Sequence, residues 1–250
     1  MKTILYSNQI NFLKLVAIIL MVVDHIGMIL YPDIELLRVV GRSAFVLFSF
    51  LIAYNYIFNT SNKIKYIQRL LLFAFISQLP YLFAMFVAGR DPDLNIFFTF
   101  SLSLIFIYLI EQKINSFILF LYFIILIYIT GLVEYGFLGV LLTISFFYYL
   151  KEKASIGFIL ILLFFLEDPV LSFYILSTSY SKLLEYNIYD YMYICSSLFS
   201  LIIIFTVKNI KDMYNLSFLR NKLFYWFYPV HLFILALINI LFFNFYFFIF

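Results

Sequence analysis

Two adjacent ionisable residues, Asp24 and His25, interrupt the first long apolar run of the chain, and Lys14 precedes the histidine by eleven positions. Eleven helical residues return to within roughly 20° of the same face and rise about 16 Å, so Lys14 and His25 are expected to face one groove. A histidine titrates near neutral pH and can act as a general base. The alternative is structural: Lys14 reaches the lipid headgroups and Asp24-His25 forms a polar patch.

The next apolar run opens with Arg38 and Arg42. An arginine keeps its charge, so each must face a partner, a cavity or the headgroups. Arg38 lies nearer the end of the run, where reaching the headgroups and pairing inside the protein are equally good alternatives. Asp24 lies at a comparable depth to Arg42 and is its candidate partner.

Further polar residues recur at the same depth. Asn95 and Thr99 lie one helical turn apart, and Glu134 precedes an apolar run, where a carboxylate also suits the start of a helix. Because these residues come from separate runs, their shared depth predicts one site. The predicted catalytic residues are His25, Asp24, Arg42, Asn95 and Glu134.

A second histidine, His231, follows Pro229, which removes a backbone donor and can kink a helix. We expect His231 to lie at a different depth from His25, nearer the cytoplasmic half. A zinc site needs three or four ligands, and these two histidines have no cysteine partner. The sequence therefore predicts no metal site.

The composition sets the environment of these groups. Of 250 residues, 66% are hydrophobic and only 12% are charged, and the mean hydropathy is +1.08. Soluble chains are about one quarter charged, so the chain is not expected to be a cytosolic enzyme, a nucleic-acid binder or a disordered protein. Long runs of Ile, Leu and Phe favour spanning helices over barrel strands. The sequence predicts an all-α integral membrane protein.

The apolar runs predict about nine transmembrane helices in one domain covering residues 1–250, without a cleavable signal peptide. Glu167-Asp168-Pro169 interrupts the seventh run and leaves the path of the chain there open. The predicted spans lie near 9–30, 36–58, 66–88, 94–111, 115–131, 133–150, 154–179, 190–207 and 222–249.

Basic and acidic residues fall in alternate connections between these runs. By the positive-inside rule, the basic connections and the N-terminus are predicted to be cytoplasmic, in a multi-pass protein of a bacterial plasma membrane. The basic set comprises Lys63, Lys65, Arg69, Lys113, Lys151, Lys153, Lys208, Lys211, Arg220 and Lys222, and the acidic set comprises Asp33, Glu35, Asp91, Asp93, Glu185 and Asp190.

Five separated runs together resemble the TraX family, whose namesake N-acetylates pilin subunits of conjugative plasmids. They cover residues 13–27, 37–45, 95–99, 134–136 and 224–232 and occur in the same order as in that family. A basic residue eleven positions before a histidine is also similar to the first helix of acyltransferase-3 and heparan acetyltransferase proteins. Those families usually carry arginine there, whereas this chain has Lys14, which keeps the charge and loses the bidentate fork.

The resemblance implies acetyl transfer from cytosolic acetyl-CoA to an amine or hydroxyl of an acceptor that arrives from the extracytoplasmic side. His25 would be the general base, Asp24 or Glu134 would orient it, and Arg42 and Asn95 would stabilise the thioester oxyanion. The acceptor is expected to be a peptide, pilin or glycan, with an exported peptide N-terminus favoured. The residues expected to bind acetyl-CoA are Lys14, Lys63, Lys65, Arg69 and His231.

Two other classes of function remain open from the residues alone. The same intramembrane charges could line the path of a transporter or permease subunit, which an interrupted helix at Glu167-Asp168-Pro169 would favour. A non-catalytic scaffold for pilus or peptide export is the other alternative.

Overall fold

A computed structural model describes residues 5–153, single positions and short stretches between 155 and 162, and residues 187–210 and 221–242. Every regular element among them is a helix, and Leu94 and Val133 form an isolated bridge. The elements are α1 (Ser7–Ile29), α2 (Glu35–Tyr54), the π-helix η1 (Asn55–Asn59), α3 (Lys63–Val87), α4 (Ile96–Glu111), α5 (Ser116–Thr130), α6 (Gly136–Leu150), α10 (Ile188–Asn209) and α11 (Asn221–Phe242).

Five of these segments are long and apolar enough to cross a membrane: Ser7–Ile29, Glu35–Asn59, Lys63–Val87, Ile188–Asn209 and Phe224–Phe242. The predicted all-helical membrane protein is therefore confirmed. The count of about nine spans is not, because α4, α5 and α6 have only 16, 15 and 15 residues. At 1.5 Å per residue they reach about 24 Å, short of a hydrocarbon core of about 30 Å. The predicted span at 154–179 lies mainly outside the described residues.

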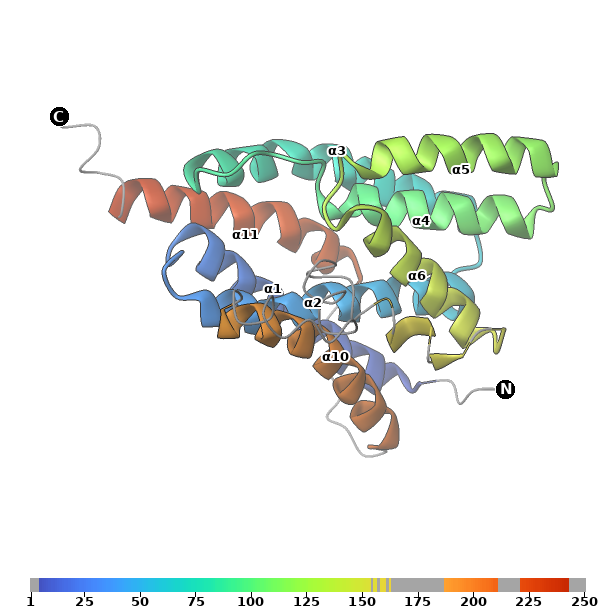
Figure 1. The fold of residues 1–250 in the computed structure, drawn as a ribbon, viewed down its shortest axis with the longest axis horizontal. Helices are drawn as coiled ribbons and strands as arrows, with labels where there is room; N and C mark the ends of the chain where they lie inside the picture. Colours follow the sequence, from blue (N-terminus) through green and yellow to red (C-terminus); the bar gives the residue numbers. More distant parts are fainter. Residues whose placement is uncertain are drawn as a thin grey trace, which may run out of the picture.

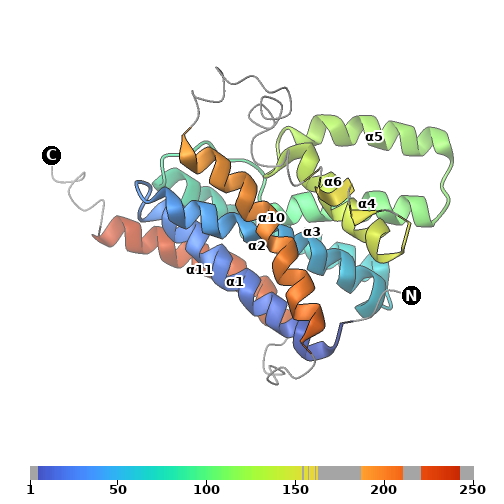
Figure 2. The ribbon, with the colours of Figure 1, turned by 60° about the horizontal axis from the view of Figure 1, so that its bottom comes forward.

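The three short helices occupy only one part of the length of the bundle. α4, α5 and α6 gather at the end where α1 begins, whereas α1, α2, α3 and α11 extend farther toward the opposite end (Figures 1 and 2). The connections that precede α4 and α6 therefore lie between the two ends of the bundle, and they place polar residues there.

Asparagine caps set where several of these helices begin. The side chains of Asn62, Asn95 and Asn115 accept hydrogen bonds from the backbone N–H groups of Lys65, Phe97 and Phe117. Such a bond satisfies one of the N–H groups that the first turn of a helix leaves without a partner.

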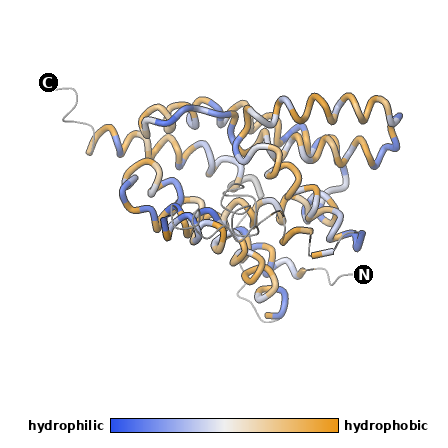
Figure 3. Tube along the Cα trace, in the orientation of Figure 1, coloured by the Kyte–Doolittle hydropathy of each residue, from blue (hydrophilic) through white to orange (hydrophobic). Residues whose placement is uncertain are grey.

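The outer surface of the bundle suits lipid. Apolar residues cover nearly all of α5 and long stretches of α3 and α11 (Figure 3), and large side chains such as Leu79, Phe86 and Tyr128 are exposed. Contiguous apolar surface of this extent is costly in water and is the expected surface of a protein in a bilayer.

A glycine lets α1 and α2 approach closely where the charged residues lie. A Cβ atom added at Gly41 would lie 2.4 Å from Cβ of Asp24, so no side chain fits there. Small residues allow this kind of close helix contact in membranes. The contact holds Asp24 against the first turns of α2.

The two ends of the bundle differ in charge. Gln9 near the start of α1 donates to the carbonyl of Val207 at the end of α10, and Glu111 at the end of α4 pairs with Lys151 after α6. The connections after α4, α6 and α10, which are basic, lie toward one end, which we call the proximal end. The α1–α2 and α3–α4 connections, to which Asp33, Asp91 and Asp93 belong, lie toward the other, the distal end (Figure 1). The cytoplasmic assignment of the proximal end stays a prediction from the positive-inside rule.

Candidate functional site

The two histidines form a hydrogen-bonded pair in the interior. Nδ1 of His25 lies 2.7 Å from Nε2 of His231, and Nδ1 of His231 lies 2.8 Å from the carbonyl oxygen of Phe227. The prediction that they lie at different depths is wrong. α11 begins nearer the middle of the bundle than α1 does (Figure 1), which brings its third turn beside the later part of α1.

The Phe227 carbonyl sets the protonation of the pair. A carbonyl only accepts, so Nδ1 of His231 carries its proton, and Nε2 of neutral His231 then accepts a hydrogen bond. Nδ1 of His25 must donate that bond, which leaves Nε2 of His25 without a proton in the neutral ring. His231 thus holds His25 in the tautomer that a general base requires.

Aromatic rings fix the pair in place. Phe227 stacks on His231 with ring centroids 5.0 Å apart, and the Tyr228 ring lies edge-on to both histidines, 6.1 Å from His25 and 5.7 Å from His231. Sequence reasoning did not single out Tyr228. With 22 tyrosines and 35 phenylalanines in the chain, an aromatic residue at one position carries little information about function.

Asp24 pairs with Arg38. Nη1 of Arg38 lies 2.5 Å from Oδ2 of Asp24, and both side chains are almost fully buried. This ion pair answers the open question about Arg38, which pairs with a carboxylate inside the protein. The sequence predicted Arg42 as the partner of Asp24. Nη1 of Arg42 instead donates a hydrogen bond to the hydroxyl of Tyr135 at 2.9 Å.

A polar cavity of about 520 Å³ opens at the distal end, and we call it the distal cavity. It contains three arginines, three carboxylates and two tyrosines from α2, α3 and the connections before α4 and α6. Its polar lining comprises Arg38, Arg42, Arg90, Asp91, Asp93, Glu134, Tyr81 and Tyr135.

Glu134 is the titrating group of the distal cavity. Burial raises the pKa of its carboxyl to about 7, although the neighbouring Arg42 and Arg38 lower it. Burial and those two arginines lower the pKa of Arg90 from its usual value. Glu134 therefore exchanges a proton near neutral pH, as a group that assists proton transfer must.

The hydrogen bonds of the Asn95 side chain give this residue a structural role. Its side chain caps α4, and its amide nitrogen donates to the carbonyl of Ala74 at 2.7 Å and to Oε1 of Gln78 at 2.7 Å. Both amide hydrogens are therefore engaged. Thr99, one turn later, donates to the carbonyl of Glu134 at 2.7 Å, so this surface of α4 holds the Glu134 connection in place.

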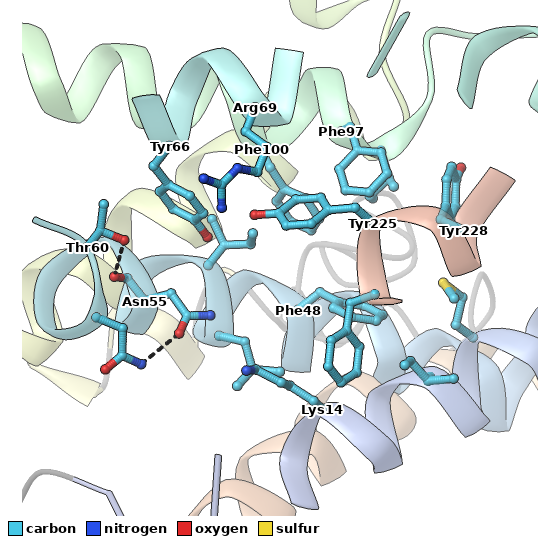
Figure 4. A pocket seen from close by; sticks show the side chains of 17 residues that line it. Lys14, Phe48, Asn55, Thr60, Tyr66, Arg69, Phe97, Phe100, Tyr225 and Tyr228 are labelled. Carbon is cyan, nitrogen blue, oxygen red and sulfur yellow. Dashed lines mark hydrogen bonds between the residues drawn. The ribbon is translucent and has the colours of Figure 1, made fainter. Parts of the chain in front are cut away.

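A second, smaller cavity of about 160 Å³ begins at the proximal end, and we call it the proximal cavity. Lys14 from α1 and Arg69 from α3 lie on opposite walls, Asn55 and Thr60 lie at the mouth, and Tyr228 closes the inner end (Figure 4). Aromatic and aliphatic side chains form the rest of the wall. The cavity thus combines a polar mouth, two cations on facing walls and an otherwise apolar lining.

The wall that α1 contributes leads to the histidines. Lys14, Ile18 and Met21 line the proximal cavity, and His25 is the next residue on that helical face. The prediction that Lys14 and His25 share a face is confirmed. Lys63 lies over the Tyr56 ring and Lys65 is exposed on the first turn of α3, and neither lines the cavity.

Among the described residues, no group of three or more His, Cys, Asp or Glu side chains could hold a metal ion. Among the described residues, the groups considered for chemistry are therefore the two histidines, the buried Asp24–Arg38 ion pair and the residues that line the two cavities.

Comparison with known protein families matches most of the chain. The family described as TraX protein matches residues 9–239. An uncharacterized protein of Rickettsia prowazekii is 33% identical over 113 residues, which is 44% of this chain and 41% of the relative. The match thus covers about two fifths of the relative's length. No solved structure matches.

Proposed function

We propose a function from the premise that this chain belongs to the TraX family. It is a membrane-embedded acyltransferase that moves an acetyl group from cytosolic acetyl-CoA to an amine or hydroxyl of an acceptor. One observation carries the proposal: a histidine pair with a defined proton arrangement lies beside Tyr228, which closes the inner end of the proximal cavity.

The proximal cavity is suited to the donor. Lys14 and Arg69 would hold the phosphates, and the apolar wall that includes Phe48 and Phe97 would hold a thin uncharged arm. Lys63 and Lys65 lie outside the cavity lining, so their contribution would be limited to attracting the anion to the proximal end.

His25 performs the proton transfer. Its unprotonated Nε2 takes a proton from the acceptor amine as the amine nitrogen bonds to the acetyl carbon, and the carbon–sulfur bond of the donor breaks. The proton then passes from His25 to the departing thiolate, so the pair returns to its starting state. His231 stabilises the imidazolium by accepting from Nδ1 of His25.

The distal cavity receives the acceptor. Arg42 is its candidate donor to the oxyanion of the transition state, and Glu134 exchanges protons with the incoming amine. Asn95, whose amide hydrogens are engaged by Ala74 and Gln78, acts by positioning α4. The favoured acceptor is the N-terminus of an exported peptide or pilin.

The test uses the purified full chain in lipid nanodiscs with labelled acetyl-CoA and a short peptide bearing a free N-terminus. The wild type should transfer label to the peptide, and His25→Ala should reduce the rate by about 100-fold or more. Lys113→Ala, a change in the α4–α5 turn outside both cavities, is the control. Equal transfer by His25→Ala and the wild type would refute the mechanism.

The two cavities at opposite ends also favour a second candidate, a transporter that admits a substrate from each side in turn. Titration calorimetry with acetyl-CoA separates the two. Micromolar binding that Lys14→Ala weakens supports the acyltransferase, whereas uptake of a solute into proteoliposomes without acetyl-CoA supports the transporter.

A further inference from the structure

We infer that the distal cavity binds a carboxylate of the acceptor, so the protein selects acidic peptides. The inference rests on the proposed acyl transfer and specifies its substrate class. It concerns the side of the site opposite the donor and is carried by the arginines that converge there.

The guanidinium groups of the three arginines of the distal cavity differ in the contacts that they make within the protein. Asp24 neutralises Arg38 at 2.5 Å. Arg42 is held by the Tyr135 hydroxyl, and the Tyr135 ring stacks on Phe45 with centroids 3.7 Å apart. Two guanidinium groups are therefore fixed in direction before any ligand arrives, which reduces the entropy lost on binding.

Arg90 is the third guanidinium and lies on the connection after α3. Arg90 is exposed, and within the part of the chain that the structure describes its guanidinium makes no hydrogen bond or ion pair, although partial burial and the nearby Arg38 and Arg42 lower its pKa. An anion placed among these groups relieves that mutual repulsion. A guanidinium also presents a planar fork that matches the two oxygens of a carboxylate.

The carboxylates of the cavity do not cancel this charge. Asp91 and Asp93 are exposed at the rim, and burial raises the pKa of Glu134 to about 7, which favours its neutral form relative to an ordinary glutamate. A protonated carboxyl donates a hydrogen bond to an anion. Arg38 and Arg42 therefore make the interior cationic, whereas the exposed rim carries Arg90 beside Asp91 and Asp93.

The rim favours a peptide over a lipid headgroup as the source of the carboxylate. Asp91 and Asp93 would repel an anionic membrane surface and attract the ammonium group of a peptide N-terminus. A volume of about 520 Å³ also accommodates more than one residue of a peptide.

The test measures binding without acetyl-CoA, so its outcome is independent of the chemistry. Tetrapeptide amides with a free N-terminus and one Asp at the second, third or fourth position are compared with their Asn counterparts by calorimetry on the full chain in nanodiscs. At least one Asp peptide should bind about tenfold more tightly than its Asn counterpart.

Variants assign that preference to the cavity. Arg90→Gln should reduce the preference to below about threefold, Arg90→Lys should keep part of it, and the proximal change Lys113→Gln should leave it intact. Equal affinities for all Asp and Asn pairs, no binding of any peptide, or an unchanged preference in Arg90→Gln would overturn the inference.

Two further outcomes separate this inference from neighbouring ideas. Thermal stabilisation by phosphatidylglycerol that Arg90→Gln abolishes, without any peptide preference, would assign the cavity to a lipid and overturn the inference. Loss of acetyl transfer with the Asp preference retained would refute the proposed function and leave the binding site standing.

Discussion

Nδ1 of His25 lies 2.7 Å from Nε2 of His231, although 206 positions separate the two residues in the chain. The bond joins the first and last described helices inside the bundle, and the Phe227 carbonyl behind it decides which nitrogen carries each proton. His231 therefore occupies the position that a carboxylate takes in other histidine-based sites.

His231→Ala removes the acceptor that holds the His25 tautomer. We expect kcat for acetyl transfer to fall about 100-fold while KM for acetyl-CoA changes little, because the donor contacts lie on Lys14 and Arg69. His231→Gln offers an amide oxygen to Nδ1 of His25 and should recover part of the rate. Steady-state kinetics with labelled donor give both constants, and an equal rise in KM would indicate a structural role.

The sequence predicted the helical class and the shared face of Lys14 and His25. These rest on local rules: composition, helical periodicity and the cost of charge in lipid. These predictions are confirmed because each depends on residues that lie close together in the chain or on the overall composition of the protein.

Pairings between distant residues could not be predicted. The partner of Asp24 is Arg38 and the partner of His25 is His231, because the close contact at Gly41 and the starting position of α11 set them. Hydropathy also overestimated the number of full spans. An apolar run does not reveal that α4, α5 and α6 stop within the bundle and leave room for the distal cavity.

Lys14→Ala should raise KM for acetyl-CoA about tenfold and lower kcat by less than threefold. Lys14 lines a wall of the proximal cavity eleven residues before His25 in α1, so its charge acts on the binding of the donor. Lys14→Arg should keep the wild-type KM, and Lys113→Ala is the matched loss of one positive charge. Equal effects of Lys14→Ala on kcat and KM would exclude a donor-binding role.

Glu134 should make stability depend on pH. Its pKa is raised in the folded protein to about 7 from 4.5, so the folded state binds the proton more tightly and is most stable below pH 4.5. Stability should fall by about 3 kcal/mol as the pH rises from 4.5 to about 7 and stay level above it. The charged and titratable groups around it are Asp24, Arg38, Arg42, Tyr81, Arg90, Asp91, Asp93, Tyr135 and Tyr228.

Thermal unfolding of the purified protein in detergent at pH 5 and pH 8 measures this dependence. Glu134→Gln should unfold at a higher temperature than the wild type at pH 8 and show a smaller difference at pH 5. The exposed carboxylate of Asp93 provides the control variant Asp93→Asn. A Glu134→Gln protein with the same pH dependence as the wild type would contradict the assignment.

Gly41→Ala should destabilise the protein by about 1–3 kcal/mol, because the new Cβ atom would meet Asp24 at 2.4 Å and push α1 and α2 apart. Gly131→Ala is the matched control, since the nearest atom to its Cβ would lie 3.5 Å away in ordinary contact. Thermal unfolding of the two variants side by side is the measurement. A Gly41→Ala protein as stable as Gly131→Ala would show that the helices can separate at little cost.

Asp24→Asn and Arg38→Gln test whether the buried ion pair is structural or catalytic. Each single change leaves one charge buried without its partner and should destabilise the protein by about 3–5 kcal/mol. The double variant loses both charges together and should be destabilised by less than the sum of the two, which a double-mutant cycle of unfolding free energies measures.

Below the unfolding temperature of Asp24→Asn, its turnover rate should stay within about threefold of the wild type, because His231 holds His25 and Asp24 does not. If the folded Asp24→Asn protein instead transferred acetyl groups about 100-fold more slowly than the wild type, Asp24 would have the catalytic role that its position beside His25 predicts from the sequence.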